Sequence, residues 1–179
     1  MGLCLSNNAS IIFNFMVFLN QKDNEKRELL HNNFPSLFTM KWNGLVDDFV
    51  PQSVDETNRD FVRWDNKHVL ERTDFFGPMF RDNNSFEYAW NRFSGIWYTD
   101  MHILDINSDQ VIPRIGEHLM QMGRSEGIDI KGNYCIQVII DKPSYDVTMQ
   151  NKNFILATVK ELESTLDISK KLYDMIKVS

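Results

Sequence analysis

The stretch from Ser108 to Asp141 reads Ser108-Asp-Gln-Val-Ile-Pro-Arg-Ile-Gly-Glu-His-Leu-Met-Gln-Met122, a glycine-containing link, and Ile128-Asp-Ile-Lys-Gly-Asn-Tyr-Cys-Ile-Gln-Val-Ile-Ile-Asp141. In its first half, apolar residues recur at spacings of four, four and three, which predicts an amphipathic helix. Its second half is a nearly continuous apolar run in which alternate residues face opposite ways, which predicts a strand. The β-rich run 96–104 precedes the helix, so we expect a strand–helix–strand unit.

Outward from this unit, local patterns predict the remaining elements. Expected strands are 11–20, 38–42 and 145–149, and expected helices are 24–33, ended by Pro35, 86–93, and a last helix from Asn153 that carries Ile155 and Leu156 inward. Residues 61–72 favour a hairpin with a three-residue loop, with a continuous helix as the alternative. Residues 166–178 continue the last helix or form an edge strand.

This order of elements predicts an α+β fold. We expect a two-layer sandwich in which a mixed or antiparallel sheet carries helices mainly on one face. At 179 residues, the chain is expected to form a single domain over residues 11–179 after a flexible terminus of ten residues. An acidic and aromatic segment at about 45–95 is expected to be inserted into this domain.

The charge of the chain bears on its partners. The net charge is −6 and the pI about 5.2, which argues against nucleic acid, because phosphate binding requires a basic surface. Residues 45–75 hold eight acids and four bases, so four of the six net negative charges lie in this central segment. A basic protein is therefore the expected partner.

Compartment is indicated by cysteines and by hydropathy. Cys4 and Cys135 are the two cysteines, and nothing in the pattern requires a bond between them, so a reducing, cytoplasmic location is expected. No apolar run approaches 18 residues, so no membrane span is expected. The start Met1-Gly-Leu-Cys-Leu-Ser6 does fit the N-myristoylation pattern. A pathogen or viral effector or adaptor anchored by lipid at Gly2 is therefore an alternative hypothesis.

The chain carries no recognised catalytic or metal-binding motif. The four histidines lie far apart and no Cys-x-x-Cys occurs, so no metal site, cofactor or catalytic residue is expected. Asp129-Ile-Lys131, with Asp105 or Asp109 upstream, has the Asp-x-Lys spacing of restriction-type nucleases. A metal-dependent nuclease is thus a second alternative, although the acidic surface opposes it and a solvated strand start explains the same residues.

The acidic segment is interleaved with large aromatic residues, which has two interpretations. Aromatic residues of this size are mostly buried, with the acids as their solvated neighbours. If a few are exposed, they provide anchors for a protein partner and the carboxylates speed its association. The residues expected to bind that partner are Asp47, Asp48, Asp55, Glu56, Asp60 and Trp64.

A small, acidic, aromatic-rich α+β chain resembles the immunity proteins of bacterial polymorphic toxin systems. The resemblance is carried by 96–174, with its strand Gly95-Ile-Trp-Tyr-Thr, its helix Val111-Ile-Pro-Arg-Ile-Gly-Glu-His-Leu, its strand Tyr134-Cys-Ile-Gln-Val-Ile-Ile and its closing helix around Leu162–Ile168. It implies a non-enzymatic inhibitor that masks the active site or surface of a basic toxin or nuclease domain. No binding residue of the family can be carried over, because no specific motif is shared.

Overall fold

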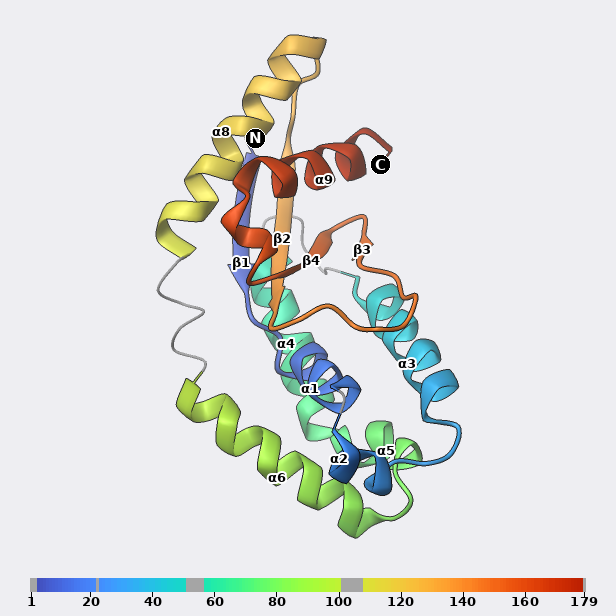
Figure 1. Cartoon of the computed structure of the whole chain (residues 1–179). Helices are drawn as coiled ribbons and strands as arrows, with labels where there is room; N and C mark the ends of the chain where they lie inside the picture. Colours follow the sequence, from blue (N-terminus) through green and yellow to red (C-terminus); the bar gives the residue numbers. More distant parts are fainter. Residues whose placement is uncertain (1–2, 22, 51–56, 101–107, 179) are drawn as a thin grey trace.

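The computed structural model describes residues 3–21, 23–50, 57–100 and 108–178, and its elements are labelled in Figure 1. The helices are α1 (Ile11–Asn20), α2 (Asn24–Leu29), α3 (Phe34–Asp48), α4 (Thr57–Leu70), α5 (Arg72–Phe76), α6 (Asn83–Asp100), α8 (Ser108–Glu126) and α9 (Thr165–Val178), with short 3-10 turns at Gly77–Met79 and Glu161–Glu163. The strands are β1 (Leu3–Asn8), β2 (Gly132–Ile139), β3 (Gln150–Asn151) and β4 (Phe154–Thr158).

The four strands form one mixed sheet in the order β1-β2-β4-β3. β2 lies parallel to both β1 and β4, whereas the two-residue β3 runs antiparallel to β4. Leu3–Asn8, expected to belong to an irregular terminus, are therefore an edge strand. Their position decides the topology, because the strand that precedes α8 in this sheet comes from the start of the chain.

Helices cover both faces of the sheet. Alternate residues of β2 and β4 separate two cores: Cys135, Ile139, Phe154 and Leu156 pack with α1, α3, α4 and α6, while Ile136, Ile155 and Ala157 pack with α8 and α9. The α+β class and the mixed sheet are confirmed, and the larger group of helices lies on one face as expected. The two helices on the second face make the sheet the middle of three layers (Figure 1).

The link between α8 and β2 is a tight helix ending. Gly127 adopts a φ of +70°, and Ile128 N donates to Gly123 O at 2.8 Å, as in a Schellman motif. A Cβ at Gly123 would lie 2.7 Å from the carbonyl oxygen of Ile128 and 2.9 Å from the Ile130 side chain. The expected helix and strand on either side are confirmed, and these two glycines allow the chain to reverse between them.

The segment 11–20, predicted to be a central strand, is the helix α1, and this prediction is wrong. All side chains from Ile12 to Leu19 are buried, so the run is apolar on every side. A short run of this kind lacks the period that separates a buried helix from a buried strand.

Charged residues of other helices cap both ends of α1, which carries no charged residue of its own. At the N-terminus, Asp65 of α4 accepts hydrogen bonds from Ser10 Oγ (2.6 Å) and from the backbone nitrogens of Ile11 (2.9 Å) and Ile12 (3.3 Å). At the C-terminus, Lys26 Nζ donates to Phe18 O at 3.1 Å. These charges complement the helix dipole and satisfy its free backbone groups.

Further local predictions are wrong. Residues 38–42 belong to α3, in which Pro35 occupies the first turn instead of ending a helix. Residues 61–72 form α4 and the start of α5, so the helical alternative to the hairpin holds. Residues 96–100 extend α6, and 101–104 lie outside the described residues. Phe154–Thr158 is β4, and the last helix starts only at Thr165, which makes 166–178 helical.

The segment between β2 and β4 is held by asparagines instead of by the expected strand at 145–149. Ile140 N donates to Asn14 Oδ1 (2.8 Å), Ser144 N to Asn20 Oδ1 (2.7 Å) and Thr148 N to Asn43 Oδ1 (2.9 Å). Every fourth backbone nitrogen is thus bound by a side-chain carbonyl of α1 or α3. Trp42 Nε1 adds a hydrogen bond to Thr148 O (2.8 Å), which fastens the same segment to α3.

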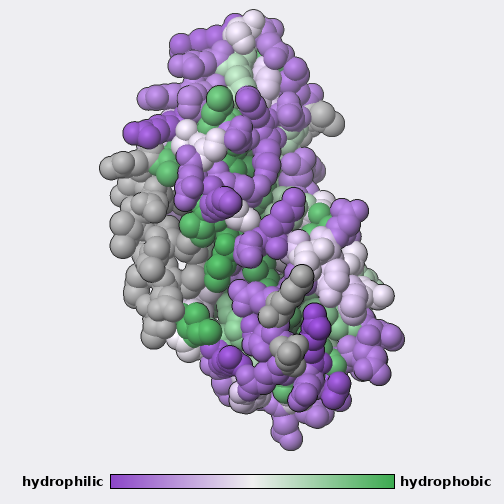
Figure 2. Space-filling view, viewed as in Figure 1, coloured by the Kyte–Doolittle hydropathy of each residue, from purple (hydrophilic) through white to green (hydrophobic). Residues whose placement is uncertain are grey.

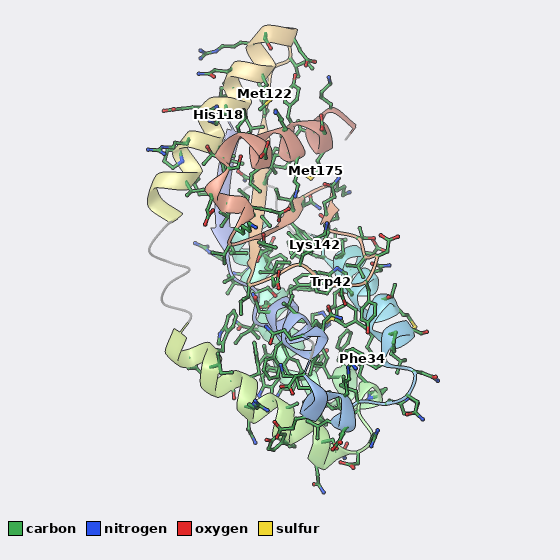
Figure 3. All side chains as sticks on the ribbon, viewed as in Figure 1. Phe34, Trp42, His118, Met122, Lys142 and Met175 are labelled. Atoms are coloured by element: carbon green, nitrogen blue, oxygen red, sulfur yellow. The ribbon has the colours of Figure 1, made fainter. Side chains whose placement is uncertain are left out.

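The two cores differ in composition. Thirteen phenylalanines and four tryptophans occur in the chain, and the buried ones gather between the sheet and helices α1 to α6. Phe34 and Trp42 lie in that half in Figure 3, whereas Met122 and Met175 lie in the half built on α8 and α9. Figure 2 shows a mostly hydrophilic face with hydrophobic residues near the middle of the molecule.

Candidate functional site

The residues expected to bind a partner are separated by the fold. Asp47 and Asp48 are exposed at the end of α3, and Trp64 is half-buried on α4. Asp60 is 93% buried, since its exposed fraction is 7%, and Arg63 lies 3.3 Å from its carboxylate. Asp55 and Glu56 lie outside the described residues. Three of the six residues therefore meet at one place on the surface.

Asp48 is the centre of this place. Its Oδ2 accepts a hydrogen bond from Trp64 Nε1 at 3.1 Å and lies 3.5 Å from His68 Nε2. Its side chain is 62% exposed, and the other oxygen, Oδ1, has no hydrogen bond within the described parts of the chain. The carboxylate is thus held in position by a tryptophan while one oxygen still faces outward.

Three aromatic rings continue from Asp48 along α4 and α5. The ring centroids of Trp64 and His68 are 4.5 Å apart, and those of His68 and Phe75 are 5.6 Å apart. We call Trp64, His68 and Phe75 the aromatic strip. Trp64 and His68 are one helical turn apart and so share a face of α4, and Phe75 follows on the next helix.

Packing beneath the aromatic strip holds α3 and α4 together. Phe49, just after α3, lies 4.8 Å from Phe61 and 6.0 Å from Trp64 between ring centroids. Phe49 and Phe61 are both almost fully buried. The aromatic strip therefore packs on buried aromatic residues, and α3 lies beside it.

The edge of α3 beside the strip carries Lys41, Gly44 and Asp48, which are one helical turn apart in succession. Lys41 Nζ lies 4.3 Å from the centre of the Phe75 ring, at the opposite end of the strip from Asp48. Burial lowers the pKa of Lys41, and no carboxylate in the described residues forms an ion pair with it. Gly44 has no atom within 4 Å of the position that a Cβ would occupy.

His68 is the most buried residue of the aromatic strip. Its exposed fraction is 8%, and neither ring nitrogen has a hydrogen-bond partner of good geometry in the described structure, although Asp48 is near. Buried polar atoms are normally paired, so an orphan imidazole requires an explanation. It is one of the features that makes this place a candidate site.

The acidic segment does not form an acidic face on α4. Asp60 and Asp65 point inward, where Asp65 caps α1, and burial raises the pKa of the Asp65 carboxyl despite its three hydrogen bonds. The exposed positions of α4 include Arg59, Arg63 and Lys67 at spacings of four. Counting charges along the sequence misses this, because acids and bases lie on different sides of one helix.

The Asp-x-Lys pattern does not gather further chemistry around itself. Asp129 and Lys131 form an exposed ion pair with each other, and Asp129 lines an open hollow of about 320 Å³ beside the end of α8. Asp105 lies outside the described residues. Among the residues that are described, no three histidine, cysteine or acidic side chains are placed to hold a metal ion, and no helix has the length and apolarity needed to cross a bilayer.

With this geometry established, comparisons with known proteins add no relative. No protein-family model, no curated protein and no solved structure matches the chain. The resemblance to immunity proteins therefore remains one of pattern. Of the site residues, Asp48 and Trp64 were predicted, whereas Lys41, Gly44 and His68 were missed because they meet only when α3 packs beside α4.

Proposed function

We propose that this protein is a non-enzymatic, cytoplasmic, protein-binding inhibitor of the immunity type, and that it covers a basic toxin or nuclease domain. The surface at the end of α3 is the contact surface in this proposal, with Asp47, Asp48 and Trp64 as its central residues. The partner's basic side chains meet the two carboxylates, and its apolar side chains meet the tryptophan.

The observation that carries the proposal is the hydrogen bond between Trp64 Nε1 and Asp48 Oδ2. It restrains an exposed carboxylate before any partner arrives, which reduces the side-chain entropy lost on binding. Tryptophan is enriched among the residues that dominate binding energies, particularly where it is surrounded by other contacts. A restrained carboxylate on a half-buried tryptophan therefore suits recognition of a basic group.

The positions of the acidic side chains on α3 and α4 limit which of them can attract a basic partner. Asp60 is buried and paired, and the outer side of α4 exposes basic residues, so the described part of α4 offers no broad acidic face that would steer a basic partner. The attraction of a basic partner is therefore assigned to the exposed carboxylates of Asp47 and Asp48. Local charge pairs of this kind affect the dissociation rate more than long-range steering does.

The test begins with capture of partners from a bacterial lysate that contains the products of neighbouring genes, read by mass spectrometry. A single basic protein, held at about one to one, is the expected result. Asp47→Asn and Asp48→Asn should then weaken its binding by about tenfold each, as expected for central charge contacts. Asp174→Asn, an exposed acid on α9, is the matched control and should leave the affinity unchanged.

The proposal has two ways to fail. If the folded chain captures no protein, the inhibitor function is wrong. If it captures a basic protein whose affinity is equal for wild type and for the Asp47→Asn, Asp48→Asn double variant, the function stands but the contact surface lies elsewhere.

A further inference from the structure

We propose that the edge of α3 and the aromatic strip recognise one helix of the partner. This helix presents a basic residue to Asp48, an acidic residue seven positions away to Lys41, and an apolar side chain between them over Gly44. The inference rests on the proposed function and specifies the partner's contact element, which that function leaves open.

Lys41 is the residue that would bind an acidic group of the partner. Its ammonium lies against the face of Phe75, is partly withdrawn from water and has no carboxylate within ion-pair distance in the described structure. Contact with an aromatic face compensates only part of the lost hydration of a cation. A carboxylate from a partner would restore a full ion pair at this position.

Asp48 is the residue that would bind a basic group of the partner, and its distance from Lys41 is fixed by the helix. The two residues are seven positions apart on α3, and a rise of 1.5 Å per residue gives a separation of about 10 Å along the helix. The exposed carboxylate of Asp48, held in place by Trp64 Nε1, suits an arginine or lysine through a charge-assisted hydrogen bond.

The 10 Å separation selects a helix over a strand. In a strand, side chains on one face repeat at about 6.7 Å and then about 13 Å, so no pair matches the distance between Lys41 and Asp48. In a helix, residues seven positions apart share a face and are about 10 Å apart. The complementary partner therefore has its acid and base at positions i and i+7.

Gly44 provides the room between the two charges. It lies midway between Lys41 and Asp48, and nothing occupies the space that a Cβ would take. A glycine inside a helix is destabilising relative to alanine, so its presence in α3 needs a compensating reason. An apolar side chain of the partner would occupy this space and pack against the aromatic strip, in which the ring of His68 is buried.

The probe is a phage-displayed library of helical peptides, selected on the full-length chain. Enriched peptides should carry an acid and a base seven positions apart with an apolar residue three or four positions from each. Binding of these peptides should weaken at least tenfold on Lys41→Glu and should be lost on Gly44→Leu. Failure to enrich peptides with this spacing, or enriched peptides that bind Gly44→Leu as tightly as wild type, would overturn the inference.

Gly44→Leu is a decisive variant because it should not damage the fold. Leucine favours a helix more than glycine does, and the site is open, so the variant should unfold at the same or a higher urea concentration. Gly95→Leu is the matched control, since Gly95 also lies in a helix, on α6, and no atom lies within 4 Å of the position that its Cβ would occupy. Lys170→Gln on α9 controls for loss of a positive charge.

The outcome also separates this inference from the proposed function. A captured protein whose affinity falls on Asp48→Asn but is equal for wild type and Gly44→Leu would contradict the helix proposal and leave the inhibitor function intact. Enriched peptides that obey the spacing, together with no captured protein, would support the strip as a helix-binding site and contradict the inhibitor function.

Discussion

The two sides of the sheet are packed in different ways. Between the sheet and α8 and α9, the buried residues are mainly aliphatic, and each helix turns one apolar side inward. Between the sheet and α1 to α6, the buried residues are mainly phenylalanine and tryptophan, and α1 is enclosed on every side. On the first side α8 could be predicted from periodicity, whereas α1 on the second side could not.

Charge follows the same division. α8 and α9 carry their own charged residues on their exposed sides, where Lys177 pairs with Glu126. α1 has none, and its two ends depend on Asp65 and Lys26 from other helices. A fully buried helix cannot carry unpaired charges on its sides, so its termini must be satisfied by residues distant in sequence.

The largest effect that distinguishes the two sides should come from Phe15→Ala. The Phe15 ring lies within 6.4 Å of five other aromatic rings, measured between centroids, among them Phe76 at 4.9 Å and Trp90 at 4.8 Å. Removal should lower the free energy of unfolding by about 3–5 kcal/mol. Ile115→Val on the aliphatic side should lower it by about 1 kcal/mol. Urea denaturation measures both, and equal losses would contradict a special role for the aromatic side.

Asp65→Ala should have the next largest effect. It leaves the backbone nitrogens of Ile11 and Ile12 and the hydroxyl of Ser10 without their acceptor, in a buried place. The expected loss is about 1–3 kcal/mol, because unsatisfied buried donors are costly. Asp65→Asn keeps an acceptor oxygen and should lose less. If the alanine and asparagine variants are equally stable, the cap contributes little.

The pH dependence of stability sharpens this test. Burial raises the pKa of Asp65, so the folded chain holds this proton more tightly than the unfolded chain, in which the pKa is about 3.9. The stability contributed by Asp65 is therefore present below about pH 4 and is lost as the pH rises through the raised pKa. Asp65→Asn does not titrate, so its stability relative to wild type should increase from pH 4 to pH 7.

Gly123→Ala tests the tight link on the aliphatic side. The added Cβ would meet the carbonyl oxygen of Ile128 at 2.7 Å, so the backbone must move, with an expected loss of about 1–2 kcal/mol. Gly44→Ala on α3 is the opposite case, because its site is open and alanine favours a helix, with an expected gain of about 0.5–1 kcal/mol. Thermal unfolding measures both, and shifts of the same sign would contradict this reading of the two glycines.

The smallest effect should come from comparing two lysines. Lys26 is 6% exposed and donates to Phe18 O and Gln21 Oε1, so Lys26→Met should lower stability by about 1 kcal/mol. Lys177 pairs with Glu126 at 2.7 Å on the exposed side of α9, where solvent weakens an ion pair. Lys177→Met should leave the urea midpoint unchanged within error. A larger loss for Lys177 than for Lys26 would contradict the importance of the α1 cap.

The sequence alone determined the α+β class, the helix predicted over 108–122 and the strand predicted over 128–141, and it named Asp48 and Trp64 as candidates that stay predictions. In each case the signal is local: a one-sided period of apolar residues, an alternation, or an acid close to an aromatic residue. The helix signal survives because α8 faces the core on one side and water on the other, whereas β2 is recognised by its apolar run because both of its faces are covered.

Tertiary structure alone decided the rest. It made 11–20 a helix, since a run that is apolar on all sides takes its conformation from what encloses it. It turned Asp60 and Asp65 inward and left basic residues outside on α4, which no count of charges along the chain reveals. It also placed Lys41 against Phe75 and Asp48 against His68, because α3 and α4–α5 meet through buried rings and not through any pattern of neighbours in sequence.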